Sequence, residues 1–312
     1  MKKKRKKGKF ILIIEYAAVY SIMLFSNLVS LRIIYMISWC LGNMLYLLVA
    51  RRRKIALENL RNALLNEPER QIRKIARKSC QSFFLTFLES AKSFHLLTAP
   101  NALDKIRNTA EDLEELFLKA KRIHDESKGC IFVTPHLGNW ELLPYVSSVV
   151  GIPLVVVVRP LDNLYLEKLF YAKRSASGQI IIPKRNAFFV LQETLQQGKS
   201  IGMLPDQSTM KGVSVNFFGR KATTTPVPAI LAIARKRPIV VVACCRRNDY
   251  RFEGFVSDPI WSEAYTSEKA EIFRLTEEMN RQMESIIRKY PEQYLWMHNR
   301  WKTYQGKKDF MA

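Results

Sequence analysis

His136 and Glu141 stand five residues apart in the segment TPHLGNWE, directly after the apolar run 130–133. A histidine oriented by a carboxylate is a general-base device, because the carboxylate fixes the tautomer and stabilises the imidazolium. Residues five apart lie about 140° apart on a helix, so the pair needs a turn. Gly138 permits that turn and Asn139 is a good N-cap, which predicts His136 on a strand-to-helix loop and Glu141 in the first helical turn. The alternative is a loop histidine that only caps the helix.

Two further charged residues follow strand-like runs. Arg159 follows the run 155–158, and Asp206 follows the run 201–204. α/β folds place ligands beyond the carboxyl ends of their strands, which is also where His136 falls. We therefore predict one site that contains all three residues. The alternatives are a structural salt bridge for Arg159 and a simple turn for Asp206.

The fold class follows from the alternation of short apolar runs with helical stretches after residue 110. It predicts an α/β domain with a central, mostly parallel sheet flanked by helices. The helical patterns that precede the sheet run over 55–64, from Pro68 onward and over 111–121. The predicted strands are 130–134, 153–158, 179–182, 200–204 and 238–244.

The N-terminal segment combines apolar length with flanking positive charge. Between residues 10 and 50 the only charges are Glu15 and Arg32. Seven positive charges in residues 2–9 and four in residues 51–54 make up half of the net charge of +22. This pattern predicts a retained membrane anchor over 1–50 and a catalytic domain over 51–312, facing the cytoplasm. One tilted span, a tight hairpin and an interfacial helix pair remain open.

Several other classes of function are disfavoured. The densest basic runs bracket the apolar segment and no zinc-finger, RNP or KH signature is present, so we expect no nucleic-acid partner. The five cysteines show no C-x2-C spacing and their number is odd, which predicts reduced thiols and no metal site. No G-x-S-x-G, H-E-x-x-H or dinucleotide-binding glycine pattern occurs.

From residue 136 onward the chain resembles the His-x4-Asp/Glu acyltransferases, and more specifically the bacterial lipid A biosynthesis acyltransferases that add lauroyl or myristoyl chains. The similarity covers most of the chain, including a basic, apolar N-terminal anchor. Blocks that follow the His136 motif in the family's order are VRPLDN (158–163), PDQ (205–207), FFG (217–219), TTTP (223–226) and PEQYLWMH (291–298).

The resemblance implies a glycerolipid acyltransferase-like α/β fold in the bacterial inner membrane. It also implies transfer of a fatty acyl chain from acyl carrier protein to a hydroxyl of an anionic, already acylated glucosamine disaccharide. His136 would be the general base and Glu141 would hold its imidazole. Arg159 would pair with a phosphate of the acceptor or stabilise the oxyanion, and Asp206 would orient Arg159 or a sugar hydroxyl. No cofactor is needed beyond the acyl thioester.

Two other functions fit the same residues. One is an acyltransferase that acts on another glycolipid or a lysophospholipid, with acyl-CoA as a possible donor. The other is a membrane-surface binding protein without catalysis, which would keep the basic patches and the anchor but would not need His136 together with Glu141. Acyl chain length and the acylated position depend on the depth of a pocket, which no short motif encodes.

Overall fold

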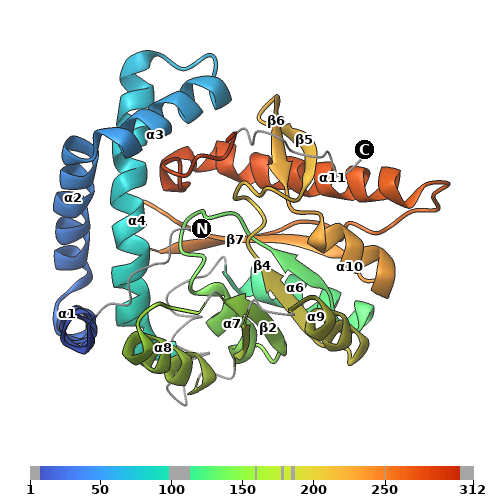
Figure 1. The fold of residues 1–312 in the computed structure, drawn as a ribbon, viewed down its shortest axis with the longest axis horizontal. Helices are drawn as coiled ribbons and strands as arrows, with labels where there is room; N and C mark the ends of the chain where they lie inside the picture. The colour runs from blue at the N-terminus through green and yellow to red at the C-terminus, as the bar shows by residue number, and fades with distance from the viewer. Residues whose placement is uncertain are drawn as a thin grey trace.

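The computed structural model describes residues 8–97, 113–158, 160–176, 179–183, 187–249 and 251–302. Its centre is a six-stranded sheet with the order β3-β2-β4-β1-β7-β8, parallel except for the antiparallel edge strand β8 (Figure 1). The strands are β1 (Ile131–Val133), β2 (Leu154–Val158), β3 (Ile180–Pro183), β4 (Ser200–Met203), β7 (Ile239–Arg246) and β8 (Phe252–Val256). The predicted α/β class is thus confirmed.

The parallel strands form from continuous β-branched and apolar runs because both faces of the sheet are covered by helices. All eight residues of β7 are buried, as are all three of β1. One face packs on α6 (Leu113–Ser127) and α7 (Leu143–Val149). The other packs on α9 (Ala187–Gln196), α10 (Val227–Arg235) and α11 (Glu268–Lys289). α8 (Leu164–Ala176) connects β2 to β3.

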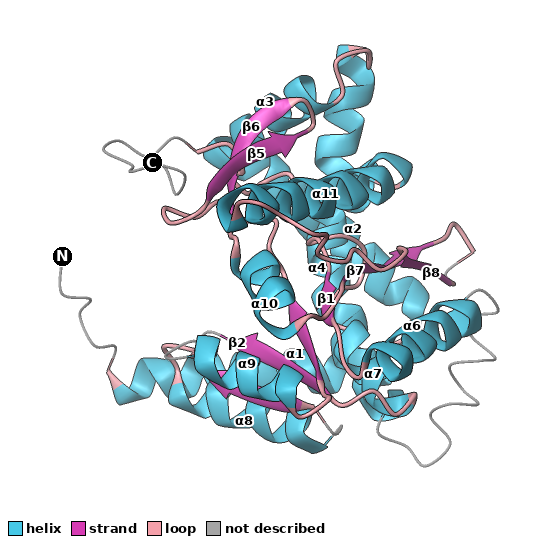
Figure 2. Cartoon of the chain, turned by 90° about the vertical axis from the view of Figure 1, so that its right-hand side faces the viewer, coloured by secondary structure: helices cyan, strands magenta, loops and turns pink. Residues whose placement is uncertain are grey.

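The first four helices along the chain form a separate layer beside the sheet. They are α1 (Lys9–Leu28), α2 (Leu31–Leu48), α3 (Ala50–Ala63) and α4 (Glu69–Leu97). α4 stands between α2 and the sheet, and α1 lies across the end of this pair beside α8 (Figures 1 and 2). Both α1 and α2 are long and apolar enough to cross a bilayer by length and composition.

Three strands were not predicted from the sequence. β5 (Val213–Phe217) and β6 (Arg220–Thr224) form an antiparallel hairpin that packs on α11, and β8 extends the sheet at its edge. Each is short and half polar, because one side faces solvent or a neighbouring helix rather than a second layer of core. A 3-10 turn, η1 (Pro291–Gln293), follows α11 and returns the chain to the end of β1.

Candidate active site

His136 lies in the loop that follows β1, at the carboxyl edge of the sheet. Its backbone is held from two sides, since its carbonyl accepts from the Leu295 N–H at 3.0 Å and its N–H donates to Asp206 Oδ2 at 2.8 Å. The neighbouring Leu137 makes a bridge to Tyr294. The side chain of His136 keeps 17% of its surface exposed, so the imidazole is fixed but still reachable.

Asp206 follows β4, the strand that pairs directly with β1, and its carboxylate meets the imidazole. Asp206 Oδ1 lies 2.7 Å from His136 Nδ1, and the carboxylate is buried at 2% exposure. The Tyr294 hydroxyl also donates a hydrogen bond to this carboxylate. The structure therefore gives Asp206 a partner that the sequence analysis did not name, the imidazole of His136.

The electrostatics of the pair favour a charged carboxylate beside a basic imidazole. Burial disfavours the charged form of His136, but the charge and hydrogen bond of Asp206 and the charge of Glu141 outweigh it and raise the His136 pKa. Burial likewise opposes ionisation of Asp206, yet His136 and Arg300 lower its pKa overall. With Nδ1–H donated to Asp206, Nε2 carries the free lone pair, 3.2 Å from Gln207 Nε2 at the exposed side.

Glu141 acts on the same imidazole through its charge. It lies in the turn before α7 and not in the first turn of that helix, where it was expected. α7 begins at Leu143 with Leu142 as its N-cap residue, so Glu141 precedes the helix. The prediction that Asn139 caps this helix was wrong. The Asn139 side chain is buried and donates instead to Glu89 Oε2 at 2.9 Å.

The turn between His136 and Glu141 requires glycine, as the sequence predicts. Gly138 has φ +61°, and a Cβ at this position would lie 2.1 Å from the Cys244 carbonyl oxygen of β7. The adjacent Asn139 N–H donates to that carbonyl at 2.8 Å. The loop is therefore pressed directly onto the backbone of a central strand, which leaves no space for a side chain.

A buried ion pair supports this loop from the side of α4. Arg246 at the end of β7 donates to Glu89 Oε2 at 2.7 Å and to Thr86 Oγ1 at 2.8 Å. Thr86 in turn donates to the Gly138 carbonyl at 2.7 Å, while Glu89 accepts from Asn139. The side chains of Arg246 and Glu89 are 6% and 4% exposed. The position of the histidine loop is thus tied to α4 as well as to the sheet.

Arg159, the remaining predicted site residue, lies outside the described residues. The residue before it, Val158, is the last of β2, which pairs with β4 on the side away from β1. The ends of β2, β4 and β1 are therefore consecutive along the carboxyl edge of the sheet.

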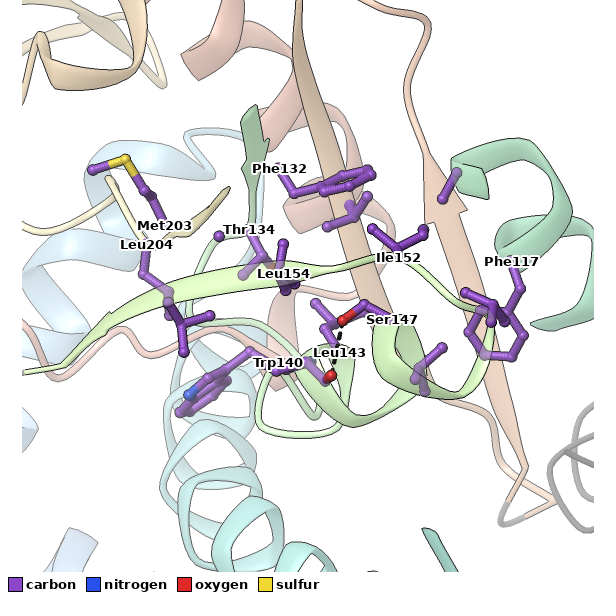
Figure 3. A pocket seen from close by; sticks show the side chains of 17 residues that line it. Phe117, Phe132, Thr134, Trp140, Leu143, Ser147, Ile152, Leu154, Met203 and Leu204 are labelled. Carbon is purple, nitrogen blue, oxygen red and sulfur yellow. Dashed lines mark hydrogen bonds between the residues drawn. The ribbon is translucent and has the colours of Figure 1, made fainter. Parts of the chain in front are cut away.

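An apolar cavity opens beside the imidazole, under α7 (Figure 3). Trp140 joins the two, because its ring contacts the His136 ring edge-on at 5.2 Å between centroids and also lines the cavity. The cavity has a volume of about 80 Å³, and its floor is the α6/α7 face of the sheet. Gly202 lies in the middle of that floor, in register with Phe132 and Val156 on either side.

Four residues of the site escaped the sequence analysis. Tyr294 belongs to the block 291–298 that carries the resemblance and Arg300 follows that block, but neither was given a role in the sequence analysis. Arg300 is 1% exposed and donates to the Thr223 carbonyl and to Thr224 Oγ1. His298 accepts from the Ser208 N–H, two residues past Asp206. The other two, Gln207 and Glu89, had no signal beyond their residue types, since their partners are remote in sequence.

Comparisons with known proteins show which family the chain belongs to. The family model for bacterial lipid A biosynthesis acyltransferase matches residues 2–303. Over 275 residues the chain is 25% identical to a lipid A biosynthesis palmitoleoyltransferase of Escherichia coli (strain K12), covering 84% of this chain and 83% of the relative. The same identity and coverage hold for a lipid A biosynthesis acyltransferase of Shigella flexneri.

A shorter similarity reaches an enzyme with a different acceptor. A phosphatidylinositol mannoside acyltransferase of Mycolicibacterium smegmatis (strain ATCC 700084 / mc(2)155) is 29% identical over 131 residues, which cover 40% of this chain and 43% of the relative. The family model, in contrast, matches nearly the whole chain. This protein belongs to the bacterial lipid A biosynthesis acyltransferase family.

Proposed function

We propose that this acyltransferase moves a fatty acyl chain from the thioester of acyl carrier protein to a hydroxyl of a lipid A precursor at the cytoplasmic face of the inner membrane. The observation that carries the proposal is the Asp206–His136 pair, which holds an imidazole with Nε2 on its exposed side, in contact with Trp140, a residue that lines an apolar cavity. The geometry provides a base for the hydroxyl and, next to it, a place for a hydrocarbon chain.

The reaction uses His136 first as base and then as acid. Nε2 takes the proton of the acceptor hydroxyl, and the oxygen attacks the thioester carbonyl carbon. The tetrahedral intermediate collapses as the C–S bond breaks, and the thiolate takes the proton back from the imidazolium. Asp206 keeps Nδ1–H in place and stabilises the positive charge, as the carboxylate of a catalytic triad does. The amide of Gln207, which now contacts Nε2, would be displaced by the hydroxyl.

The acyl chain would occupy the cavity under α7. Its lining is almost entirely apolar, and burying a methylene group stabilises a complex by about 0.8 kcal/mol. Trp140 lines the cavity and contacts the imidazole, so it would lie beside the thioester. Arg159 would bind a phosphate of the anionic acceptor, since it follows the strand next to β4.

The deciding experiment is acyl transfer by purified protein in detergent, with lauroyl, myristoyl and palmitoleoyl donors, as carrier-protein and CoA thioesters, and a tetra-acylated lipid A precursor. Mass spectrometry should show the gain of one acyl chain, lost in His136→Ala. The variant His124→Gln serves as the histidine control and should remain active, because His124 contacts Ser200 at the start of β4, away from the carboxyl edge of the sheet. An equal rate for wild type and His136→Ala would contradict the proposal.

A second acceptor class is favoured by the similarity to the mannoside acyltransferase. The same base and cavity would serve a hydroxyl of another glycolipid or of a lysophospholipid, with acyl-CoA as donor. Offering these acceptors in the same assay separates the two functions, because the donor cavity and His136 are common to both. Transfer only to the second set would replace lipid A as the acceptor and leave the mechanism unchanged.

A further inference from the structure

α2 has two unlike faces, and only one of them is covered by protein. The covered face repeats every four residues through Ile34, Ser38, Gly42 and Tyr46, all buried. It packs on α4 so tightly that a Cβ on Gly42 would lie 2.5 Å from the Gln81 Cα. The other face exposes large apolar side chains to the surroundings: Leu31, Ile33, Met36, Trp39, Met44, Leu47 and Leu48.

The covered face excludes a bilayer that α2 would cross in this fold. Tyr46 near the end of α2 contacts Arg77, and Lys92 donates to the Val29 carbonyl just before α2 begins, so α4 runs antiparallel along the whole helix. On its other side α4 holds Arg246 through Glu89. A membrane perpendicular to α2 would therefore contain the end of β7 and the active-site loop at the same depth, and hydrocarbon does not tolerate exposed loops or an open sheet edge.

α1 is also attached to the protein along its length. The Asn163 amide, just before α8, donates to the Leu12 carbonyl at 2.8 Å and contacts Glu15 Oε2 at 3.1 Å. At its other end Lys92 of α4 reaches the carbonyls of the last turn. α1 is seen end-on in Figure 1 and lengthwise in Figure 2, whereas α2 stands upright in Figure 1, so the two helices cross at a steep angle. They therefore do not form a membrane hairpin.

We propose that α1 and α2 lie in the plane of one membrane leaflet and that neither crosses the bilayer. The outer sides of both helices expose large apolar side chains, to which α1 contributes Phe10, Ile11, Ile13, Ile14, Ile22, Leu24, Phe25 and Leu28. The fitting partner is an anionic lipid surface. α3 begins directly after α2 and contains the run Arg51–Lys54, in which three of the four cations are exposed, and residues 2–7 before α1 carry six more positive charges.

Trp39 tests this arrangement because it is the ninth of the 18 residues of α2 and is 58% exposed. A spanning α2 would hold its indole near the bilayer midplane, whereas an in-plane α2 holds it near the headgroups. Quenching by lipids brominated at successive acyl positions should be strongest for the shallowest bromine. Subtracting the fluorescence of the Trp39→Phe variant leaves the signal of Trp39 without that of the other tryptophans. Strongest quenching by the deepest bromine, or no quenching at any depth, would overturn the proposal.

Cysteine labelling tests both helices at once. The background is Cys40→Ser, which removes the exposed thiol and leaves four buried ones. Gly8→Cys and Ser30→Cys mark the two ends of α1, and Glu67→Cys marks the loop before α4 as the control. The protein is reconstituted in liposomes and labelled with a maleimide that is either trapped in the lumen or added outside. The ratio of luminal to external labelling should be the same for all three thiols. An inverted ratio at residue 8 or 30 would reveal a crossing. Neither experiment needs a substrate, so both are independent of the proposed reaction.

Discussion

At the scale of single residues, the site is a histidine whose basicity is set by two carboxylates of different kinds. Asp206 is buried, bonds to Nδ1 and shares its hydrogen-bonding capacity with the Tyr294 hydroxyl. Glu141 contributes its charge from the turn before α7. Hydrogen bonding fixes a tautomer, whereas a charge alone changes only the pKa, so the two carboxylates should have separable effects.

The pH dependence of transfer should report the raised pKa of His136. Because the base must be neutral, kcat/KM should fall as the pH drops through a pKa above the ordinary histidine value of 6.5. Asp206→Asn removes the charge that raises this pKa, so the acidic limb should move to lower pH while the rate falls by about 10²- to 10⁴-fold. A pH–rate profile with an unshifted limb in Asp206→Asn would show that another group titrates.

Glu141→Gln should shift the same limb in the same direction with a smaller loss of rate. The Asp206 hydrogen bond still holds Nδ1–H in this variant, and only the charge near the imidazole is lost. Parallel profiles for Glu141→Gln and Asp206→Asn measure the difference. If Glu141→Gln lost more kcat than Asp206→Asn, Glu141 would be the residue that orients the imidazole, as the sequence analysis expected.

Gly202 should influence which acyl chains are accepted. A Cβ there would lie 3.1 Å from Val156 Cγ1 and 3.3 Å from Leu154 Cδ2, on the floor of the cavity. Gly202→Ala should therefore lower the preference for the longest accepted chain over a shorter one by about 10-fold, the scale of one misplaced methylene group. Competition between donors of different length measures this ratio. An unchanged ratio with an unchanged melting temperature would place the chain elsewhere.

At the scale of elements, the site depends on how the histidine loop is clamped between α4 and β7. Arg246→Met should lower the free energy of unfolding by about 3–5 kcal/mol, because Glu89 loses its buried partner. Adding Glu89→Gln to this variant should recover part of the loss, since the uncompensated charge is removed. Thermal unfolding of both single variants and the double variant tests this coupling. Strictly additive losses would mean that the two side chains contribute separately.

The elements also show what the sequence could and could not predict. The five predicted strands are short, mostly apolar runs, which are typical of strands in a parallel sheet that is covered on both faces. β5, β6 and β8 lack such runs and depend on α11 and on the edge of β7 for their pairing. The same dependence on distant parts of the chain explains why the contact between His136 and Asp206 was not predicted. The ends of β1 and β4 meet only because β4 inserts beside β1, and that strand order is not visible in the sequence.

At the scale of the whole molecule, the proposed function requires a strongly basic protein to bind both a membrane and an acyl donor. The net charge of +22 attracts anionic lipid, and the proposed carrier protein is acidic. In the arrangement that we propose, the exposed sides of α1 and α2 make the apolar contact with the leaflet, so the carrier protein would approach the domain from the aqueous side. The boundary predicted at residue 50 falls between α2 and α3, but it stays a prediction, because both apolar helices pack on the rest of the chain.

This division of contacts predicts how salt affects each substrate. If the carrier protein is recognised mainly through charge, its KM should rise several-fold between about 0.05 and 0.3 M salt. The reason is that added salt shortens the screening length and so weakens the attraction between the basic enzyme and the acidic carrier protein. The KM for an acyl-pantetheine without the protein should change little, because the cavity under α7 is apolar and apolar contacts are not screened. Measuring both donors with the acceptor held in neutral detergent micelles removes the membrane from the comparison. Equal salt dependence for the two donors would show that the carrier protein contributes no charged contact and that the basic surface serves the lipid alone.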